Sequence, residues 1–160
     1  MNTGQMMLGV GAMVLLSLVV LRVNNSFLLT NTAMMESKFD LLATSLAQSV
    51  IEEADNKAFD QKSIGIPIFA VNTFSDILGP DSEDYSEFND FDDFNGYTRD
   101  VTNLPSANFH VSCTVSYVSP ANPDVVSISK QWSKKITVTV SSTSSQDTIK
   151  VSSIFSYWYF

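Results

Sequence analysis

Residues 6–21 read MMLGVGAMVLLSLVVL, and this apolar stretch decides the fold expected for the chain. As an α-helix, sixteen residues rise about 24 Å, close to the hydrocarbon thickness of a bilayer. A cleavable secretion signal is the alternative, but no basic residue precedes the stretch and no Ala-x-Ala pattern follows it. Gly9 and Gly11 would weaken an isolated helix, yet small residues let helices approach closely. The pattern therefore favours a membrane anchor that packs against copies of itself.

The helical pattern continues well beyond this stretch, but on one face only. Apolar residues recur every three or four positions, at Met35, Phe39, Leu42, Ala43, Leu46, Ala47, Val50, Ile51 and Ala54. No proline precedes Pro67, so we expect one helix from near residue 2 to about Asp55, weakest at residues 24–26. Residues 1–29 form its apolar half and residues 30–57 its amphipathic half.

The carboxy-terminal part, residues 109–160, changes to a period of two. In FHVSCTVSYV (109–118), Phe109 and every second residue up to Tyr117 share one face. KKITVTVSS (134–142) and TIKVSSIFSYW (148–158) predict two more strands, separated by turns at SPANPD (119–124) and SSQD (144–147). The sequence thus predicts an α+β fold, in which the long N-terminal helix packs on a small antiparallel sheet.

The negative charge of the chain is concentrated in a connecting region, residues 58–108. The 160-residue chain has a net charge of −8, and residues 58–105 hold ten acidic and two basic side chains. This balance argues against nucleic acid as a partner, because phosphates require clustered Lys and Arg. Carboxylates at Asp90, Asp92 and Asp93 suggest a Ca²⁺ site, although their spacing does not match an EF-hand loop. The sequence therefore favours a solvated loop whose aromatic residues pack onto the sheet, with the Ca²⁺ site as the alternative.

No pattern of residues predicts catalysis. His110 and Cys113, each the only residue of its type, fall on opposite faces of one predicted strand and cannot form a Cys–His pair. A glycine-rich phosphate loop and zinc-type ligand spacing are also missing. The single cysteine excludes an internal disulfide. We therefore expect a protein that is not an enzyme and uses no cofactor.

Together these features resemble a type IV pilin or a pilin-like protein of a secretion system. Gly4 precedes the apolar stretch as a processing glycine would, with Gln5 after it, and DFDDFNGY (90–97) is similar to the acidic loop of some minor pilin-like proteins. The chain departs from the family where a glutamate is usual at the fifth mature position. That position is Gly9 after cleavage at Gly4, or Gln5 in an already mature chain. The common carboxy-terminal disulfide is also missing.

The resemblance implies a subunit that resides in the inner membrane, is processed by a prepilin peptidase, and is polymerised by a pilus assembly machinery into a cell-surface filament. The self-association surface in the filament core would be Met6, Met7, Leu8, Gly9, Val10, Gly11, Met13, Val14, Leu15, Leu16, Leu18, Val19, Val20 and Leu21. Charge contacts between neighbouring subunits would join Asp81, Glu83 and Asp84 to Lys130, Lys134 and Lys135.

Two other functions share the predicted architecture. One is a minor pilin or pseudopilin of a secretion apparatus, which would be scarce in filaments. The other is a single-span membrane-anchored binding domain whose acidic aromatic loop holds a ligand or an ion. The sequence leaves open whether a filament would serve adhesion, motility, DNA uptake or secretion.

Overall fold

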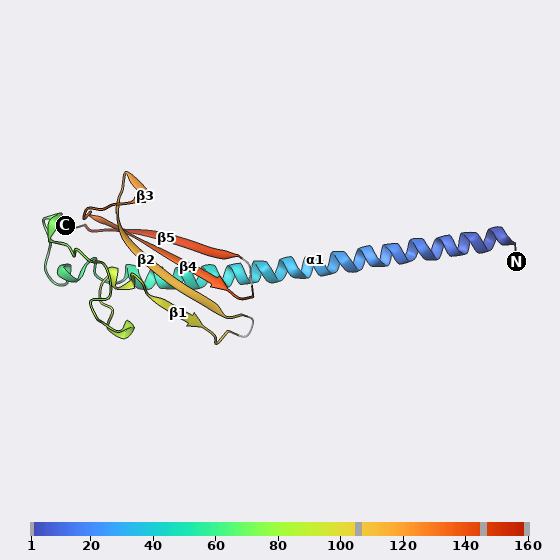
Figure 1. Cartoon of the computed structure of the whole chain (residues 1–160), viewed down its shortest axis with the longest axis horizontal. Helices are drawn as coiled ribbons and strands as arrows, with labels where there is room; N and C mark the ends of the chain where they lie inside the picture. The colour runs from blue at the N-terminus through green and yellow to red at the C-terminus, as the bar shows by residue number, and fades with distance from the viewer. Residues whose placement is uncertain (1, 105–106, 145–146, 159–160) are drawn as a thin grey trace. The chain divides into compact units, whose positions relative to one another are not determined.

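The computed structural model describes residues 2–104, 107–144 and 147–158. The chain divides into two compact units, Met1–Phe39 and Asp40–Phe160. One helix, α1 (Thr3–Asp55), precedes five strands (Figure 1). The strands are β1 (Thr98–Val101), β2 (Phe109–Ser119), β3 (Asn122–Val126), β4 (Ser133–Ser142) and β5 (Thr148–Ser156). The predicted α+β class is confirmed.

Helix α1 is a single helix of 53 residues and runs without a break through residues 24–26, the step predicted to be weakest. Three of its hydroxyl side chains find partners within the helix. The hydroxyls of Ser17, Thr30 and Thr32 each donate to the carbonyl four residues earlier, at 2.9–3.0 Å. Such internal bonds satisfy hydroxyl groups in apolar surroundings, where water cannot do so.

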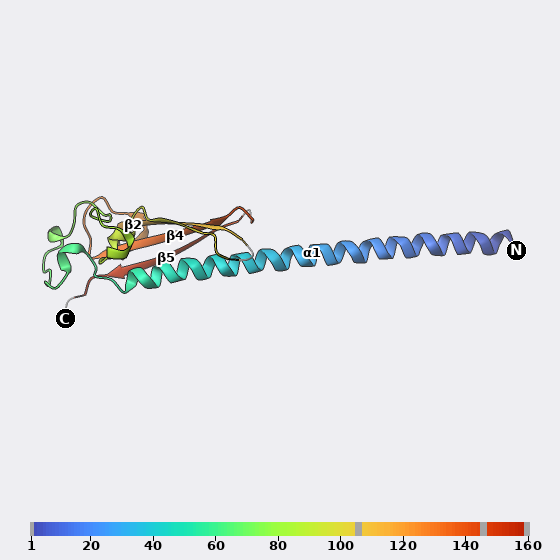
Figure 2. The ribbon, with the colours of Figure 1, turned by 90° about the horizontal axis from the view of Figure 1, so that it is seen from below.

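The part of α1 within the second unit, from Asp40 on, packs along one face of the sheet (Figure 2). The buried residues follow the predicted stripe, at Ala43, Ala47, Val50, Ile51 and Ala54. Because three of these five are alanine, the helix backbone can approach the sheet closely. Met35, at the start of the predicted stripe, is instead half exposed at 51%.

The sheet is antiparallel, with strand order β1-β2-β4-β5 and with β3 paired to β2. The three predicted strands are confirmed as β2, β4 and β5. Strands β1 and β3 were not predicted. The SPANPD segment, predicted as a turn, contains the start of β3, because the chain reverses tightly after Ser119 and pairs back at Asn122. Residues 145–146, in the second predicted turn, lie outside the described residues.

The acidic region between Ala58 and Tyr97 wraps back onto the sheet through four short 3₁₀ turns, at Gln61–Ser63, Val71–Thr73, Tyr85–Glu87 and Asp92–Phe94. Its phenylalanines Phe88, Phe91 and Phe94 are buried, as predicted. The expectation of a solvated loop was wrong for Asp90, Asp92 and Asp93, which are 1–2% exposed, but Asp81, Asp84 and Glu87 are exposed. This region therefore forms part of the core.

Replacing Phe91 with alanine should lower the free energy of unfolding by about 3–5 kcal/mol, because the ring is fully buried and the change leaves a cavity. Ile128→Ala is the control, since Ile128 is fully exposed and its loss should change stability by less than about 0.5 kcal/mol. Urea unfolding of the full chain in detergent, followed by tryptophan fluorescence, measures both. Equal effects of the two changes would contradict the packing described.

Candidate functional site

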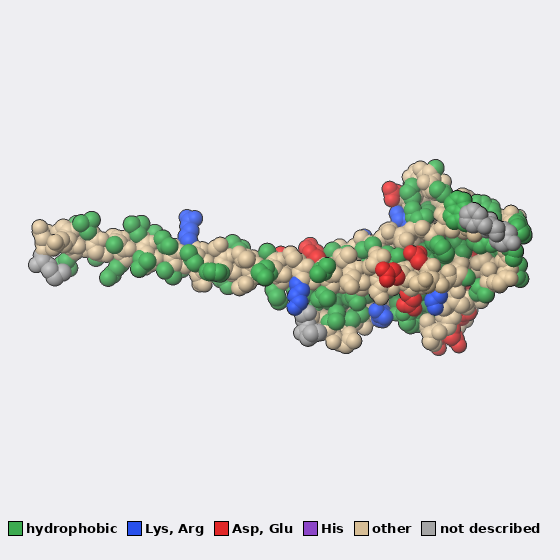
Figure 3. Space-filling model, turned by 180° about the vertical axis from the view of Figure 1, so that it is seen from behind, with side chains coloured by type: hydrophobic (Ala, Val, Ile, Leu, Met, Phe, Trp, Pro, Cys, Tyr) green, Lys and Arg blue, Asp and Glu red, His purple; other side chains and the backbone are tan. Residues whose placement is uncertain are grey.

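The first candidate site is the apolar surface of α1 within the first unit. Every described residue from 2 to 38 is exposed. The residues predicted for the filament core, between Met6 and Leu21, are mostly more than half exposed, and Leu8 reaches 76%. By length and composition α1 is the one described helix able to cross a membrane. Figure 3 shows its hydrophobic side chains projecting outward. An apolar surface of this extent needs lipid or protein to cover it.

The second candidate site is a buried cluster of charges centred on Lys134 of β4. Its Nζ donates to Asp60 Oδ2 at 2.9 Å, to the carbonyl of Phe59 at 2.7 Å, and to Asp92 Oδ1. The side chains of the lysine and of both aspartates are 0–2% exposed. Nζ also lies 4.5 Å from the centroid of the Phe59 ring. The three donor positions of the ammonium are therefore filled away from water.

Asp60 is held by more hydrogen bonds than any other carboxylate of this cluster. Besides Lys134, it accepts from the backbone amides of Lys62 and Ser75, from Ser75 Oγ, and from the hydroxyl of Tyr117 at 3.4 Å. Burial by itself would raise its pKa, but the Lys134 charge and these hydrogen bonds outweigh burial and hold the pKa below 3.8. Asp60 is thus ionised in the resting protein.

Asp92 and Asp90 have pKa values shifted the other way. Burial raises the pKa of Asp92 to about 6, although the Lys134 charge opposes the shift. Burial, together with the negative charges of Asp92 and Asp93, raises the pKa of Asp90 to about 8. One oxygen of Asp90 accepts from the amides of Asp92 and Asp93 at 3.1 Å. Its other oxygen, Oδ2, is buried with no partner among the described residues.

The three carboxylates proposed to bind Ca²⁺ accept hydrogen bonds from other groups of the protein. Asp93 Oδ2 accepts from the amides of Asn89 and Asp90 at 2.8 and 3.0 Å, and Asp92 is bound by Lys134. Within the part of the chain that the structure describes, no group of three or more His, Cys, Asp or Glu is placed to hold a metal ion. Asp90, Asp92 and Asp93 therefore make a hydrogen-bonded turn beside a lysine.

The residues predicted for charge contacts between subunits are distributed differently from the expectation. Lys134 was wrongly assigned, because it is fully buried and bonded within its own chain. Lys130 pairs with Asp76 at 2.7 Å, and Lys135 with Asp124 at 3.2 Å. Of the three acidic residues, Asp81 and Asp84 are exposed, and Glu83 accepts hydrogen bonds from Asn89.

His110 and Cys113 lie on opposite faces of β2, as predicted. His110 is exposed and its Nδ1 lies 2.6 Å from Asp100 Oδ1, whereas Cys113 is 2% exposed. Burial raises the pKa of the Cys113 thiol to about 11. A protonated, buried thiol is a packing residue and a poor nucleophile.

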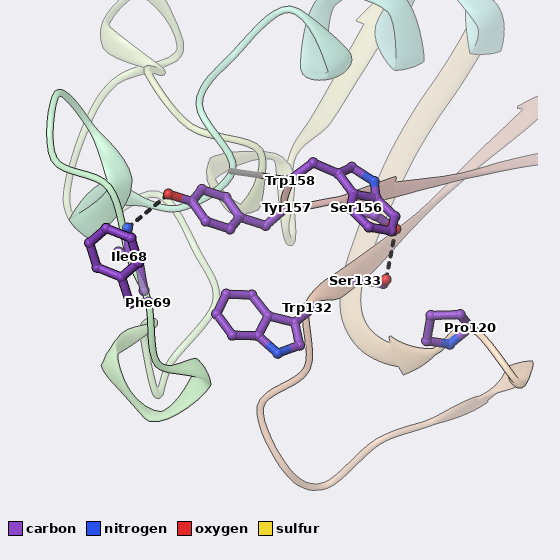
Figure 4. A pocket seen from close by; sticks show the side chains of 8 residues that line it. All are labelled: Ile68, Phe69, Pro120, Trp132, Ser133, Ser156, Tyr157 and Trp158. Atoms are coloured by element: carbon purple, nitrogen blue, oxygen red, sulfur yellow. Dashed lines mark hydrogen bonds between the residues drawn. The ribbon is translucent and has the colours of Figure 1, made fainter. Parts of the chain in front are cut away.

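A third feature, not predicted, is an aromatic pocket of about 600 Å³ at one end of the sheet (Figure 4). Its lining comprises Ile68, Phe69, Pro120, Trp132, Ser133, Ser156, Tyr157 and Trp158. The Tyr157 hydroxyl accepts from the amide of Ile68 at 2.8 Å, and the rings of Trp132 and Tyr157 stack 5.8 Å apart. Apolar and aromatic walls with the hydroxyl groups of Ser133, Ser156 and Tyr157 are suited to a small, mainly apolar ligand.

The buried position of Lys134 could have been predicted from the alternation of residues in β4. Lys134 has the same parity as Ile136, Val138 and Val140, so it begins the inward face of β4. Its register partner on β2 is Tyr117, which is also on the inward face. A lysine at such a position needs a buried counter-charge, and only the acidic region carries enough carboxylates to supply it.

Comparisons with protein-family models, with curated proteins and with solved structures gave no match to this chain. Its function is therefore argued from its own residues.

The folded protein should lose stability as the pH rises from about 4 to about 8. Asp90 has a folded pKa of about 8, above its ordinary value of 3.8, so over this range the native state holds a proton that the unfolded state has lost. Asp90→Asn keeps the acceptor oxygen without the charge, and should flatten the decline by up to about 1.4 kcal/mol per pH unit. Urea unfolding at several pH values measures this.

The control for this experiment is Asp81→Asn, which removes an exposed carboxylate from the same region. It should leave the pH profile unchanged. A profile for Asp90→Asn that matches the unaltered protein at every pH would contradict the raised pKa of the buried Asp90 carboxyl.

Proposed function

We propose that this protein is the structural subunit of a cell-surface helical filament of the type IV pilus kind, held in the inner membrane before assembly. The observation that carries the proposal is the exposed apolar surface of α1 between Met6 and Leu21, continuous with a helical segment whose own apolar face is already covered by a sheet. Lipid can cover the exposed surface before assembly, and equivalent helices of neighbouring subunits can cover it afterwards.

The energetics support association through this surface. Apolar area removed from water contributes about 25 cal/mol per Å², so this surface is held strongly out of water, by lipid or by neighbouring helices. Because lipid is as apolar as the helix, association within the membrane would be favoured by close packing of helices, which Gly9 and Gly11 permit. A contact that repeats head to tail without closing generates a filament. Processing between Gly4 and Gln5 and the use of an assembly machinery remain part of this proposal through the family resemblance.

Intersubunit charge pairs are a smaller part of the proposal. Asp81 and Asp84 are exposed and available to a neighbour. Lys150 is the exposed lysine of the sheet, whereas Lys130 and Lys135 already have partners in their own chain. Exposed pairs contribute at most about 1 kcal/mol each, so they would orient subunits more than hold them.

A second candidate function is a membrane-anchored binding domain, and the aromatic pocket beside Trp132 favours it. In that case the pocket, and not the acidic region, would hold the ligand. A minor pilin or pseudopilin is a third candidate with the same architecture.

One experiment separates these functions. Cells producing the protein are sheared, and the released fraction is examined by intact mass and by negative-stain microscopy. The proposal predicts thin filaments with this chain as the dominant species. Filaments containing only traces of the chain indicate a minor subunit. A chain that stays wholly in the membrane as a monomer overturns the filament proposal and favours the binding domain.

Gly11→Leu should abolish filaments while leaving the chain in the membrane at its normal level. Nothing in the subunit lies within 4 Å of a Cβ added at Gly11, so the subunit itself tolerates a side chain there. Closely packed neighbouring helices would not tolerate it. The readouts are the amount of chain in the membrane fraction and the amount in the sheared fraction.

Met13→Leu, a substitution of similar volume on the same helix, is the matched control and should assemble normally. Normal filaments from Gly11→Leu would contradict close packing of the helices at this glycine.

A further inference from the structure

The buried cluster around Lys134 contains the chemical groups that an intramolecular amide cross-link requires. A primary amine lies in contact with two carboxyl groups, one from the segment that follows α1 and one from the Asp92–Phe94 turn. All three side chains are at most 2% exposed. We propose that Lys134 Nζ and the side-chain carboxyl of Asp92 join in an intramolecular isopeptide bond, with Asp60 as the general base.

The two aspartates are suited to different roles by their surroundings. Asp60 accepts four hydrogen bonds from Lys62, Ser75 and Tyr117 besides that from Lys134, and these favour its ionised form. Asp92 has far fewer donors around it, and burial raises its pKa to about 6. Asp92 thus takes up a proton readily, and a neutral carboxylic acid is the form that an amine can attack. Asp60 remains the base.

The Lys134 amine is surrounded by aromatic rings as well as by the two carboxyl groups. Lys134 Nζ lies over the Phe59 ring at 4.5 Å and 5.4 Å from the centroid of the Tyr117 ring. Burying ions in such a site is costly, so replacing an ammonium and a carboxylate by a neutral amine and a neutral acid lowers that cost. Contact in a fixed geometry supplies the high effective concentration that amide formation needs.

The balanced reaction starts from the Lys134 ammonium, the Asp60 carboxylate and the Asp92 carboxylic acid. The ammonium gives one proton to Asp60, and the free amine attacks Cγ of Asp92 to form the C–N bond. The C–O bond to the Asp92 hydroxyl then breaks, and a second proton moves from the nitrogen to the leaving oxygen through Asp60. The products are the amide, one water molecule and protonated Asp60. Neither an oxidant nor an activated co-reactant takes part.

The cross-link would join the acidic region to β4 across 42 positions of sequence. It would fix this region to the sheet independently of the hydrogen bonds around it. This modification goes beyond the proposed function, because it concerns the second unit alone. The bond could form equally in a filament subunit and in an anchored binding domain.

Intact mass of the denatured full-length chain, purified in detergent and incubated at acidic, neutral and mildly alkaline pH, tests the proposal. The expected mass is one water below that calculated for the same chain, which begins at Met1 or, after processing, at Gln5. Full mass under every condition would overturn the proposal.

Trypsin mapping locates the bond, because cleavage after Lys62 separates the two aspartates. Asp60 falls in peptide 58–62 and Asp92 in peptide 63–99. The expected product is a branched peptide that joins 63–99 to 131–135, with no cleavage after the acylated Lys134. A branch to peptide 58–62 would overturn the assignment of Asp92.

Three variants complete the test. Asp92→Asn keeps the shape of the side chain and should form the same bond with loss of ammonia in place of water. Lys134→Arg keeps a positive charge but lacks the amine, and should retain full mass. Asp60→Asn removes the base and should slow or abolish the loss of water. Persistent loss of water in Lys134→Arg would overturn the proposal.

Discussion

The structure of the second unit depends on the buried ammonium of Lys134. It joins strand β4 to two points of the acidic region, namely Asp60 near the start of the region and Asp92 near its end. A buried ion pair adds little net stability compared with an apolar core, but removing one partner leaves an uncompensated charge and is strongly destabilising. The lysine therefore acts chiefly to specify how the acidic region folds onto the sheet.

With the acidic region held on the sheet, the sizes of the side chains determine how this region and α1 share the face of the sheet. Phenylalanines of the acidic region, such as Phe91 and Phe94, cover the sheet where α1 does not. Beneath α1, alanines such as Ala47 and Ala54 allow a close approach of helix to strands. Large side chains from a loop and small ones from a helix thus share one sheet face. The opposite face of the sheet, rich in Ser and Thr, meets solvent.

The sequence predicts most of this architecture because it is governed by periodicity. The three-and-four spacing of residues 35–54 and the alternation in β2, β4 and β5 each reflect burial on one face. Strands β1 and β3 have four and five residues and lie at the edges, so alternation is too short to detect. The charge cluster was missed for another reason. Lys134 was interpreted by its type, as a surface residue, although its parity with Ile136 placed it on the inward face.

Burial of these charges also bears on how subunits would associate. Lys134 is neutralised inside its own fold, and Lys130 and Lys135 already have internal partners, so few lysines of the second unit remain to attract the acidic residues of a neighbour. The chain carries a net charge of −8, and like charges on adjacent subunits repel one another over about 8 Å at physiological salt. The net charge thus opposes close contact between copies, and exposed charge pairs would orient subunits without holding them together. In the proposed filament the favourable free energy of association comes chiefly from packing of the apolar surface of α1, where charged residues are nearly absent.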